Sequence, residues 1–171
     1  MKQHHVFSFL QRMGKSFMLP IAVLPVAGIF LGVGSSLTNE TTIAALHLES
    51  VLGQGTFLYS VLILLKQVGK VLFDNLPLIF AVSIALGMSK RRKEVAALAA
   101  IIAFFVMHAT INTLLCLDGS IVNGVVSNYI LDGSITSVCG MLSLEMGVFG
   151  GIVVGLGVSY LHNRFYQIQL P

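Results

Sequence analysis

Four polar side chains interrupt long apolar stretches of the sequence and are the candidates for chemistry: Asp74, Asn75, His108 and Asn112. A polar or ionisable group inside a membrane span is costly to bury. It therefore indicates a substrate or ion path unless a structural partner accounts for it. No Ser/His/Asp or Cys/His arrangement surrounds these positions, so we expect no catalytic residue in the chain.

Asp74 and Asn75 stand together close to a proline. Lys70 precedes Asp74 by four residues, which places both on one face of a continuous helix. A structural ion pair is favoured over a polar gate at Asp74. Pro77 follows Asn75 and leaves a backbone carbonyl without its helical partner. That carbonyl could face a ligand at a broken span, although a simple kink is favoured.

His108 and Asn112 are also four residues apart and share one helical face. A hydrogen bond from His108 to another helix is favoured over a position lining a cavity. All four polar residues therefore remain weak candidates for substrate binding.

The composition indicates which solvent surrounds the chain. Of its 171 residues, 56% are hydrophobic and 10% are charged. Soluble domains carry about 25% charged residues, so lipid must contact much of this surface. About 20 apolar residues cross a bilayer as a helix. Four stretches have nearly that length or more: 16–37, 71–88, 95–115 and 142–161.

The segments between these spans complete the predicted organisation. Residues 1–15 are polar and basic with a modest apolar face, which predicts a cytoplasmic amphipathic helix on the membrane surface. The membrane-embedded part is then 16–171. Residues 55–70 form either the first piece of a broken helix or a surface helix. The expected fold is an all-α integral membrane protein with about four transmembrane helices and this additional helix before the second span.

Basic residues are distributed unevenly along the chain. Eight of the ten lie in 1–15, in 90–93 or at Arg164, and the two long connections at 38–54 and 116–140 contain none. Cytoplasmic loops are enriched in Lys and Arg. Both termini and 90–93 are therefore predicted to be cytoplasmic.

Several site classes are not supported by the sequence. The formal net charge is +3, but no stripe of Lys and Arg with interleaved aromatics indicates nucleic-acid binding. No Cys/His spacing indicates a metal site, and no cofactor is expected. Cys116 and Cys139 both fall on the predicted outer side. Two free thiols are favoured there, and a disulfide in an oxidising periplasm is the alternative.

Glycines occur at helical spacing in the first and fourth predicted spans. Gly28 and Gly32 form a GxxxG pair, for which ordinary membrane-helix composition is the favoured explanation. Among the glycines of 147–157, Gly147, Gly151 and Gly155 recur every four residues, and these glycines predict tight packing of that helix.

Five blocks, taken together, resemble the glucose/maltose-type EIIC membrane component of the bacterial phosphoenolpyruvate:sugar phosphotransferase system. They follow that family's order and cover nearly the whole chain. The blocks are 14–25 (GKSFMLPIAVLP), 72–81 (LFDNLPLIFA), 95–100 (VAALAA), 147–152 (GVFGGI) and 163–166 (NRFY).

The resemblance implies sugar uptake coupled to phosphorylation in the bacterial cytoplasmic (inner) membrane. It implies a homodimer, a sugar substrate and an EIIB domain or subunit that carries a phosphocysteine. In this family the front helices mainly build the dimer interface, and a sugar-carrying part moves against them. The back half supplies most sugar contacts, including a Glu in a Thr-Glu-Pro-type motif.

The sequence departs from the family pattern at its end. It contains no Thr-Glu-Pro motif and no second set of spans, so we expect a truncated EIIC that needs its C-terminal half as a partner. Neither cysteine has the Arg-rich flanks of an EIIB cysteine. The alternative is a standalone four-helix membrane interaction or regulatory protein, or a non-functional remnant.

Overall fold

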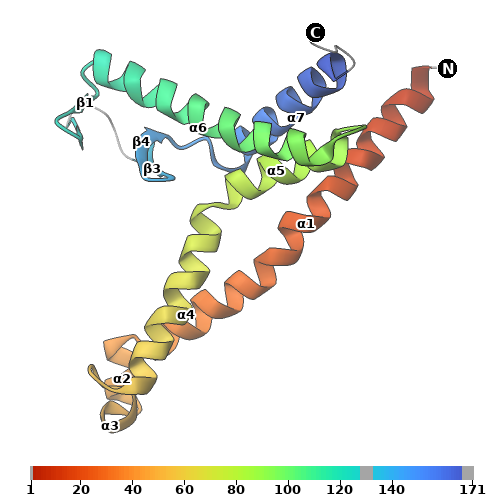
Figure 1. Cartoon of the computed structure of the whole chain (residues 1–171). Helices are drawn as coiled ribbons and strands as arrows, with labels where there is room; N and C mark the ends of the chain where they lie inside the picture. Colours follow the sequence, from red (N-terminus) through yellow and green to blue (C-terminus); the bar gives the residue numbers. More distant parts are fainter. Residues whose placement is uncertain (1, 128–132, 167–171) are drawn as a thin grey trace. The chain divides into compact units, whose positions relative to one another are not determined.

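The computed structural model describes residues 2–127 and 133–166, and most of them are helical (Figure 1). The helices are α1 (Lys2–Leu37), α2 (Glu40–Ala45), α3 (Glu49–Leu52), α4 (Phe57–Asp74), α5 (Leu76–Met88), α6 (Lys93–Leu117) and α7 (Gly147–Phe165). The strands are β1 (Ile121–Val122), β2 (Val125–Val126), β3 (Ile135–Val138) and β4 (Met141–Leu144). The predicted helical membrane fold is confirmed, and two short hairpins add to it.

Two compact units make up the chain. Unit 1 consists of Met1–Pro20 and Asn75–Pro171, and unit 2 is Ile21–Asp74. Helix α1 contributes its first part to unit 1 and the remainder to unit 2. The helix is continuous from Lys2, so 1–15 and the first predicted span belong to one helix. The surface position of 1–15 stays a prediction.

In unit 2, α1 and α4 approach each other through glycine backbone. A Cβ placed on Gly69 would lie 2.5 Å from the backbone nitrogen of Leu31, and one on Gly34 would lie 2.6 Å from the backbone nitrogen of Lys66. Gly28 and Gly32 have no neighbour within 4 Å of such a Cβ. Close packing of α1 against α4 therefore uses Gly34, and the pair Gly28 and Gly32, for which ordinary composition was the favoured explanation, takes no part in it.

The connection between α1 and α4 closes unit 2 with a small apolar cluster. Ile43, Leu52 and Leu62 are buried together there, on α2, α3 and α4. Asn39 begins α2, and its side-chain oxygen accepts a hydrogen bond from the backbone N–H of Thr41 at 3.0 Å. Such a cap satisfies a donor that the first helical turn leaves unpaired.

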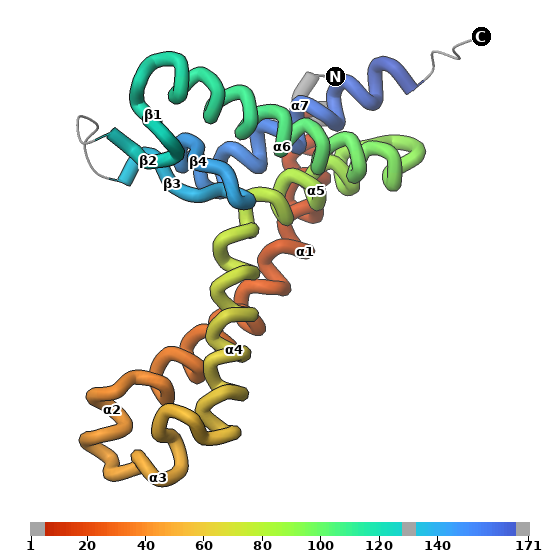
Figure 2. Tube along the Cα trace, turned by 60° about the vertical axis from the view of Figure 1, so that its left-hand side comes forward, coloured from red at the N-terminus to blue at the C-terminus, as the bar shows by residue number. Residues whose placement is uncertain are grey.

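In unit 1, α5 packs against both α6 and α7 (Figure 2). Small residues allow this approach, because Ala85, Ala96 and Ala100 are fully buried together. On α7, a Cβ at Gly155 would lie 2.7 Å from the carbonyl oxygen of Ala81, and one at Gly151 would collide with the carbonyl of Pro77. The predicted tight packing of this helix is confirmed at these two glycines.

A proline in α1 provides a bonding partner for α5 within unit 1. Pro20 is buried and has no N–H, so it leaves the carbonyl oxygen of Ser16, four residues earlier, without its helical donor. The hydroxyl of Ser83 on α5 donates a hydrogen bond to that oxygen. The pairing satisfies a buried acceptor that the sequence of α1 creates.

Strands β1, β2 and β3 lie in the region predicted to be a polar connection, 116–140, whereas β4 extends into the predicted span 142–161. β1 pairs with β2, and β3 pairs with β4 in an antiparallel register that places Val138 opposite Met141. The two residues between β3 and β4, Cys139 and Gly140, have φ of 50° and 84°. Two left-handed residues suit a tight hairpin turn. β4 takes Met141–Leu144, so the helix predicted from residue 142 begins at Gly147 instead.

Among the described residues, Val6–Leu37 and Lys93–Leu117 are long and apolar enough to cross a membrane, or three spans are present if α4 and α5 count as one. The four-span count stays a prediction. The predicted span 71–88 is not continuous, because Asn75 separates α4 from α5. Pro77 lies in the first turn of α5, where its missing N–H costs no bond. Residues 57–74 form α4, and both possibilities for 55–70, the first piece of a broken helix or a surface helix, stay predictions.

Candidate functional site

Asp74 lies at the end of α4 in unit 2. Its carboxylate is 4.0 Å from the ammonium of Lys70, and the two side chains are 56% and 60% exposed. The structure therefore contains the ion pair that the spacing predicts. Exposed pairs of this kind contribute about 0–1 kcal/mol. The geometry gives Asp74 a local structural partner in Lys70.

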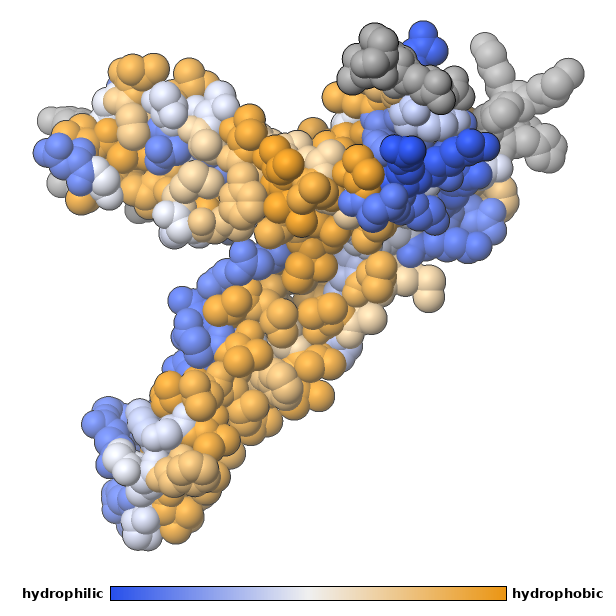
Figure 3. All heavy atoms as spheres, viewed as in Figure 1, coloured by the Kyte–Doolittle hydropathy of each residue, from blue (hydrophilic) through white to orange (hydrophobic). Residues whose placement is uncertain are grey.

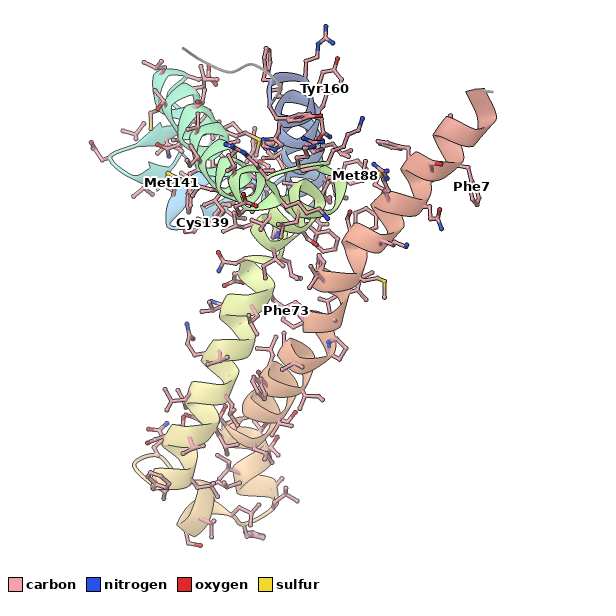
Figure 4. The ribbon with its side chains drawn as sticks, turned by 45° about the vertical axis from the view of Figure 1, so that its right-hand side comes forward. Phe7, Phe73, Met88, Cys139, Met141 and Tyr160 are labelled. Carbon is pink, nitrogen blue, oxygen red and sulfur yellow. The ribbon has the colours of Figure 1, made fainter. Side chains whose placement is uncertain are left out.

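The other three candidates contact one element of unit 1, the β3–β4 hairpin. Asn75, which precedes α5, accepts a hydrogen bond from the thiol of Cys139 at 3.4 Å. Cys139 lies at the turn of the hairpin, close to Met141 (Figure 4). Sequence analysis placed Asn75 at a kink or ligand site. The structure gives it a hairpin partner that is 64 residues away along the chain.

His108 and Asn112 bind the second strand of the same hairpin. Nδ1 of His108 is 2.7 Å from the hydroxyl of Ser143, and these side chains are 2% and 0% exposed. The Asn112 amide donates to the carbonyl of Leu142 at 2.7 Å. The bonds were expected to join two helices, but the partner is a strand. The four-residue spacing placed His108 and Asn112 on one face of α6, and it gave no information about the hairpin.

Together these contacts tether the hairpin to α5 and α6. The ring of Phe104 adds an edge-on contact to His108, with ring centroids 4.5 Å apart. A buried polar group with a partner is stable, whereas the same group without one is costly. The geometry therefore favours a structural role for this cluster. Sequence analysis missed Ser143, because a serine in an apolar stretch carries no signal of its partner.

Both cysteines are free thiols in this structure. Cys116 is exposed near the end of α6, whereas Cys139 is partly buried in the hairpin turn. Burial raises the pKa of the Cys139 thiol, because it disfavours the charged thiolate. The protonated thiol is a poor nucleophile and a suitable donor to Asn75.

A second polar region lies at the other end of unit 1. A cavity of about 750 Å³ opens between the start of α1, the α5–α6 turn and the last turns of α7. Its cations are Arg12, Lys90 and Arg164, and Figure 3 shows hydrophilic side chains gathered over this end. Sequence analysis used these residues for orientation and did not predict that they share a cavity.

Side chains of α7 hold the α5–α6 turn in place beside this cavity. The Asn163 side chain accepts from the backbone N–H of Lys90 at 2.8 Å and donates to the carbonyl of Met88 at 3.0 Å. Nε2 of His162 lies 2.8 Å from the carbonyl oxygen of Arg91. Arg92 then begins α6 with φ of 46°, a left-handed conformation that is uncommon outside glycine.

No group of three or more His, Cys, Asp or Glu side chains that could hold a metal ion occurs among residues 2–127 and 133–166. Two groups of residues each share a site. The hairpin cluster is built from hydrogen-bonding side chains, and the basic cavity is lined by cationic side chains.

Comparison with known proteins gives one family. Residues 14–171 match the family described as phosphotransferase system, EIIC. The chain is 37% identical over 166 residues to the PTS system glucose-specific EIICBA component of Staphylococcus saprophyticus subsp. saprophyticus, which covers 97% of this chain. The chain spans 23% of the length of that relative. Since the family match extends over nearly every described element, this chain belongs to the EIIC family of the phosphotransferase system.

Proposed function

We propose that the chain is part of a sugar permease of the phosphotransferase system, and that it takes part in glucose-type uptake coupled to phosphorylation. The observation that carries the proposal is the family match over residues 14–171, together with 37% identity to a glucose-specific component. The sugar would be held by the complete permease, and no residue of this chain is assigned to phosphoryl transfer.

An EIIB domain or subunit is the proposed phosphoryl donor. The relative is named an EIICBA component, which supports a B component as the partner of a C component. A homodimer, in which this chain supplies the fixed part, is proposed from the resemblance. Buried tethers such as His108 to Ser143 suit a part of the permease that keeps its shape.

The proposed location is the bacterial inner membrane with both termini in the cytoplasm. Arg12, Lys90 and Arg164 line one cavity of unit 1, which supports placing their three segments on the same side. Cys116 should then face outward. A membrane-impermeant maleimide added to intact cells is expected to label it, and labelling only after lysis would reverse the orientation.

A chimera tests the transport proposal. Residues 1–171 replace the matching segment of the staphylococcal EIICBA component in cells that lack a glucose permease, and phosphoenolpyruvate-dependent uptake of radiolabelled glucose is measured. Uptake above that of a strain with the segment deleted is expected. Membrane insertion is checked by the maleimide assay on Cys116. An inserted chimera without uptake would contradict the proposal and favour a membrane interaction protein or a remnant.

A further inference from the structure

The cavity at the end of unit 1 combines two kinds of surface. Its three cations come from three separate elements: Arg12 from α1, Lys90 from the α5–α6 turn and Arg164 from α7. Apolar side chains line the same cavity, among them Met88 and Tyr160, which are labelled in Figure 4. The apolar lining also includes Phe9 and Leu156.

Among residues 2–127 and 133–166, the cations of the cavity have no carboxylate partner. Within the described ranges, the ion pair present is Lys70 with Asp74, and no carboxylate lies within 4.0 Å of the three cavity cations. The described part of the lining contains no acidic residue. Three positive charges that share one cavity without neutralisation attract an anion.

The turn that carries Lys90 is fixed before any ligand arrives. The side chain of Asn163 forms hydrogen bonds with the backbone of Lys90 and Met88, so α7 sets the position of this turn. A turn whose backbone is held in place loses less conformational freedom on binding. The cavity therefore has the properties of a preformed site, and its volume of about 750 Å³ is large enough for more than a small ion.

We propose that this cavity binds one anionic phospholipid, with the phosphate against Arg12, Lys90 and Arg164. The beginning of an acyl chain would lie along Phe9 and Leu156. The apolar part of the lining favours a phospholipid over free phosphate, because free phosphate has no apolar group to bury against it. Basic pockets beside membrane helices are suited to acidic lipid headgroups, and α1 contains a membrane-length apolar segment from Val6 to Leu37. The inference does not depend on sugar transport.

Lipid titration of the purified chain tests the site. Binding of dioleoyl phosphatidylglycerol and of phosphatidylcholine is measured by native mass spectrometry in detergent. The double variant Arg12→Gln/Arg164→Gln is expected to lose roughly ten- to thirty-fold in affinity for phosphatidylglycerol. A matched control, Arg91→Gln/Lys93→Gln, removes two charges from the same basic region outside the cavity lining and should change affinity about threefold at most. Equal losses in both double variants would overturn a defined site.

Two further variants separate the sources of phosphate and guard against misfolding. Arg12→Lys/Arg164→Lys keeps both charges and should retain phosphatidylglycerol binding. Retained binding would show that the loss in the Gln double variant comes from the removed charge. Phe9→Gln removes apolar surface at a side chain that is already 45% exposed. It should weaken the binding of phosphatidylglycerol and leave unchanged the extent to which inorganic phosphate displaces this lipid. Displacement of the lipid by millimolar inorganic phosphate, or equal binding of phosphatidylcholine, would overturn the proposal.

Discussion

Unit 1 and unit 2 hold their helices together by different means. In unit 2, α1 and α4 meet at Gly34 and Gly69, and Thr38 is the buried polar side chain among residues 21–74. The hydroxyl of Thr38, which directly follows α1, donates a hydrogen bond to the carbonyl of Gly34 in that helix. Unit 1 also uses glycine contacts, but it adds buried polar bonds between elements, such as those of Ser83 and His108.

The difference shows that packing and hydrogen bonding supply different information. Glycine contacts set how near two helices come, and they tolerate sliding when the facing surfaces are uniform. A directional bond between two particular atoms fixes the register as well. Unit 1 contains an irregular element, the β3–β4 hairpin. Val138 and Cys139 of this hairpin pack against the buried cluster of Ala81, Phe104 and Val154, and the bonds to His108 and Asn112 add directional contacts.

The glycine contacts should produce the largest effect when they are broken. Gly151→Leu in unit 1 forces a side chain into the backbone of Pro77, and Gly69→Leu in unit 2 does the same against Leu31. We expect a loss of about 3 kcal/mol or more in each case, because backbone cannot move aside cheaply. Thermal unfolding of the purified chain in detergent measures it.

Open positions on the same helices serve as controls for that experiment. A Cβ at Gly157 on α7 or at Gly28 on α1 meets nothing within 4 Å. Gly157→Leu and Gly28→Leu should therefore unfold at nearly the same temperature as the parent chain. Comparable losses at all four glycines would show that close approach is not the cause, since leucine is a better helix former than glycine and helix propensity predicts no loss.

The polar tether of unit 1 should give the next largest effect. His108→Ala leaves the hydroxyl of Ser143 buried without its partner, which costs about 1–3 kcal/mol. Ser143→Ala removes the other member. In a double-mutant cycle we expect a coupling energy of about 0.6–1.7 kcal/mol, the range found for bonds in membrane proteins. Additive losses would show that the bond does not hold the hairpin.

Thiol chemistry sharpens the contrast within unit 1. Because burial raises the pKa of Cys139, the thiolate forms at higher pH than in an ordinary cysteine, and alkylation should be slow at neutral pH and increase at more alkaline pH. Iodoacetamide labelling of Cys116→Ser chains across a pH series measures the profile. Asn75→Ala removes the acceptor of the Cys139 thiol. It tests whether the rate of labelling depends on the contact between the β3–β4 hairpin and Asn75. A profile centred on the ordinary cysteine pKa would contradict the burial.

The ion pair of unit 2 should give the smallest effect. Lys70 and Asp74 are both more than half exposed. Asp74→Asn is expected to change the free energy of unfolding by about 0.5 kcal/mol at most, and 0.5 M salt should remove the difference. Loss of transport in an Asp74→Asn version of the chimera, with stability unchanged, would instead show that this carboxylate has a functional role.

The sequence predicted the features that depend on local periodicity. Apolar runs located α1 and α6, and four-residue spacing located the Lys70–Asp74 pair and the shared face of His108 and Asn112. The spacing of glycines on α7 predicted its close packing. Each of these properties is decided within a few turns of one helix.

Features that depend on distant segments could not be predicted in this way. The β3–β4 hairpin lies in a stretch without strong alternation, and its turn uses Cys139, which is an unusual residue at positive φ. The break at Asn75 required knowing that Pro77 begins a helix and does not kink one. The basic cavity joins residues from α1, the α5–α6 turn and α7, so no single segment indicates it.

The hydrogen bond between the hydroxyl of Ser83 and the carbonyl of Ser16 has a consequence for sequence evolution. A lineage that replaces Pro20 by alanine restores the N–H, returns the Ser16 carbonyl to its own helix and removes the need for a donor at position 83. A lineage that loses the serine first leaves a buried oxygen unsatisfied. Among descendants we therefore expect substitutions at position 83 to follow substitutions at position 20, although 63 residues separate them in the chain.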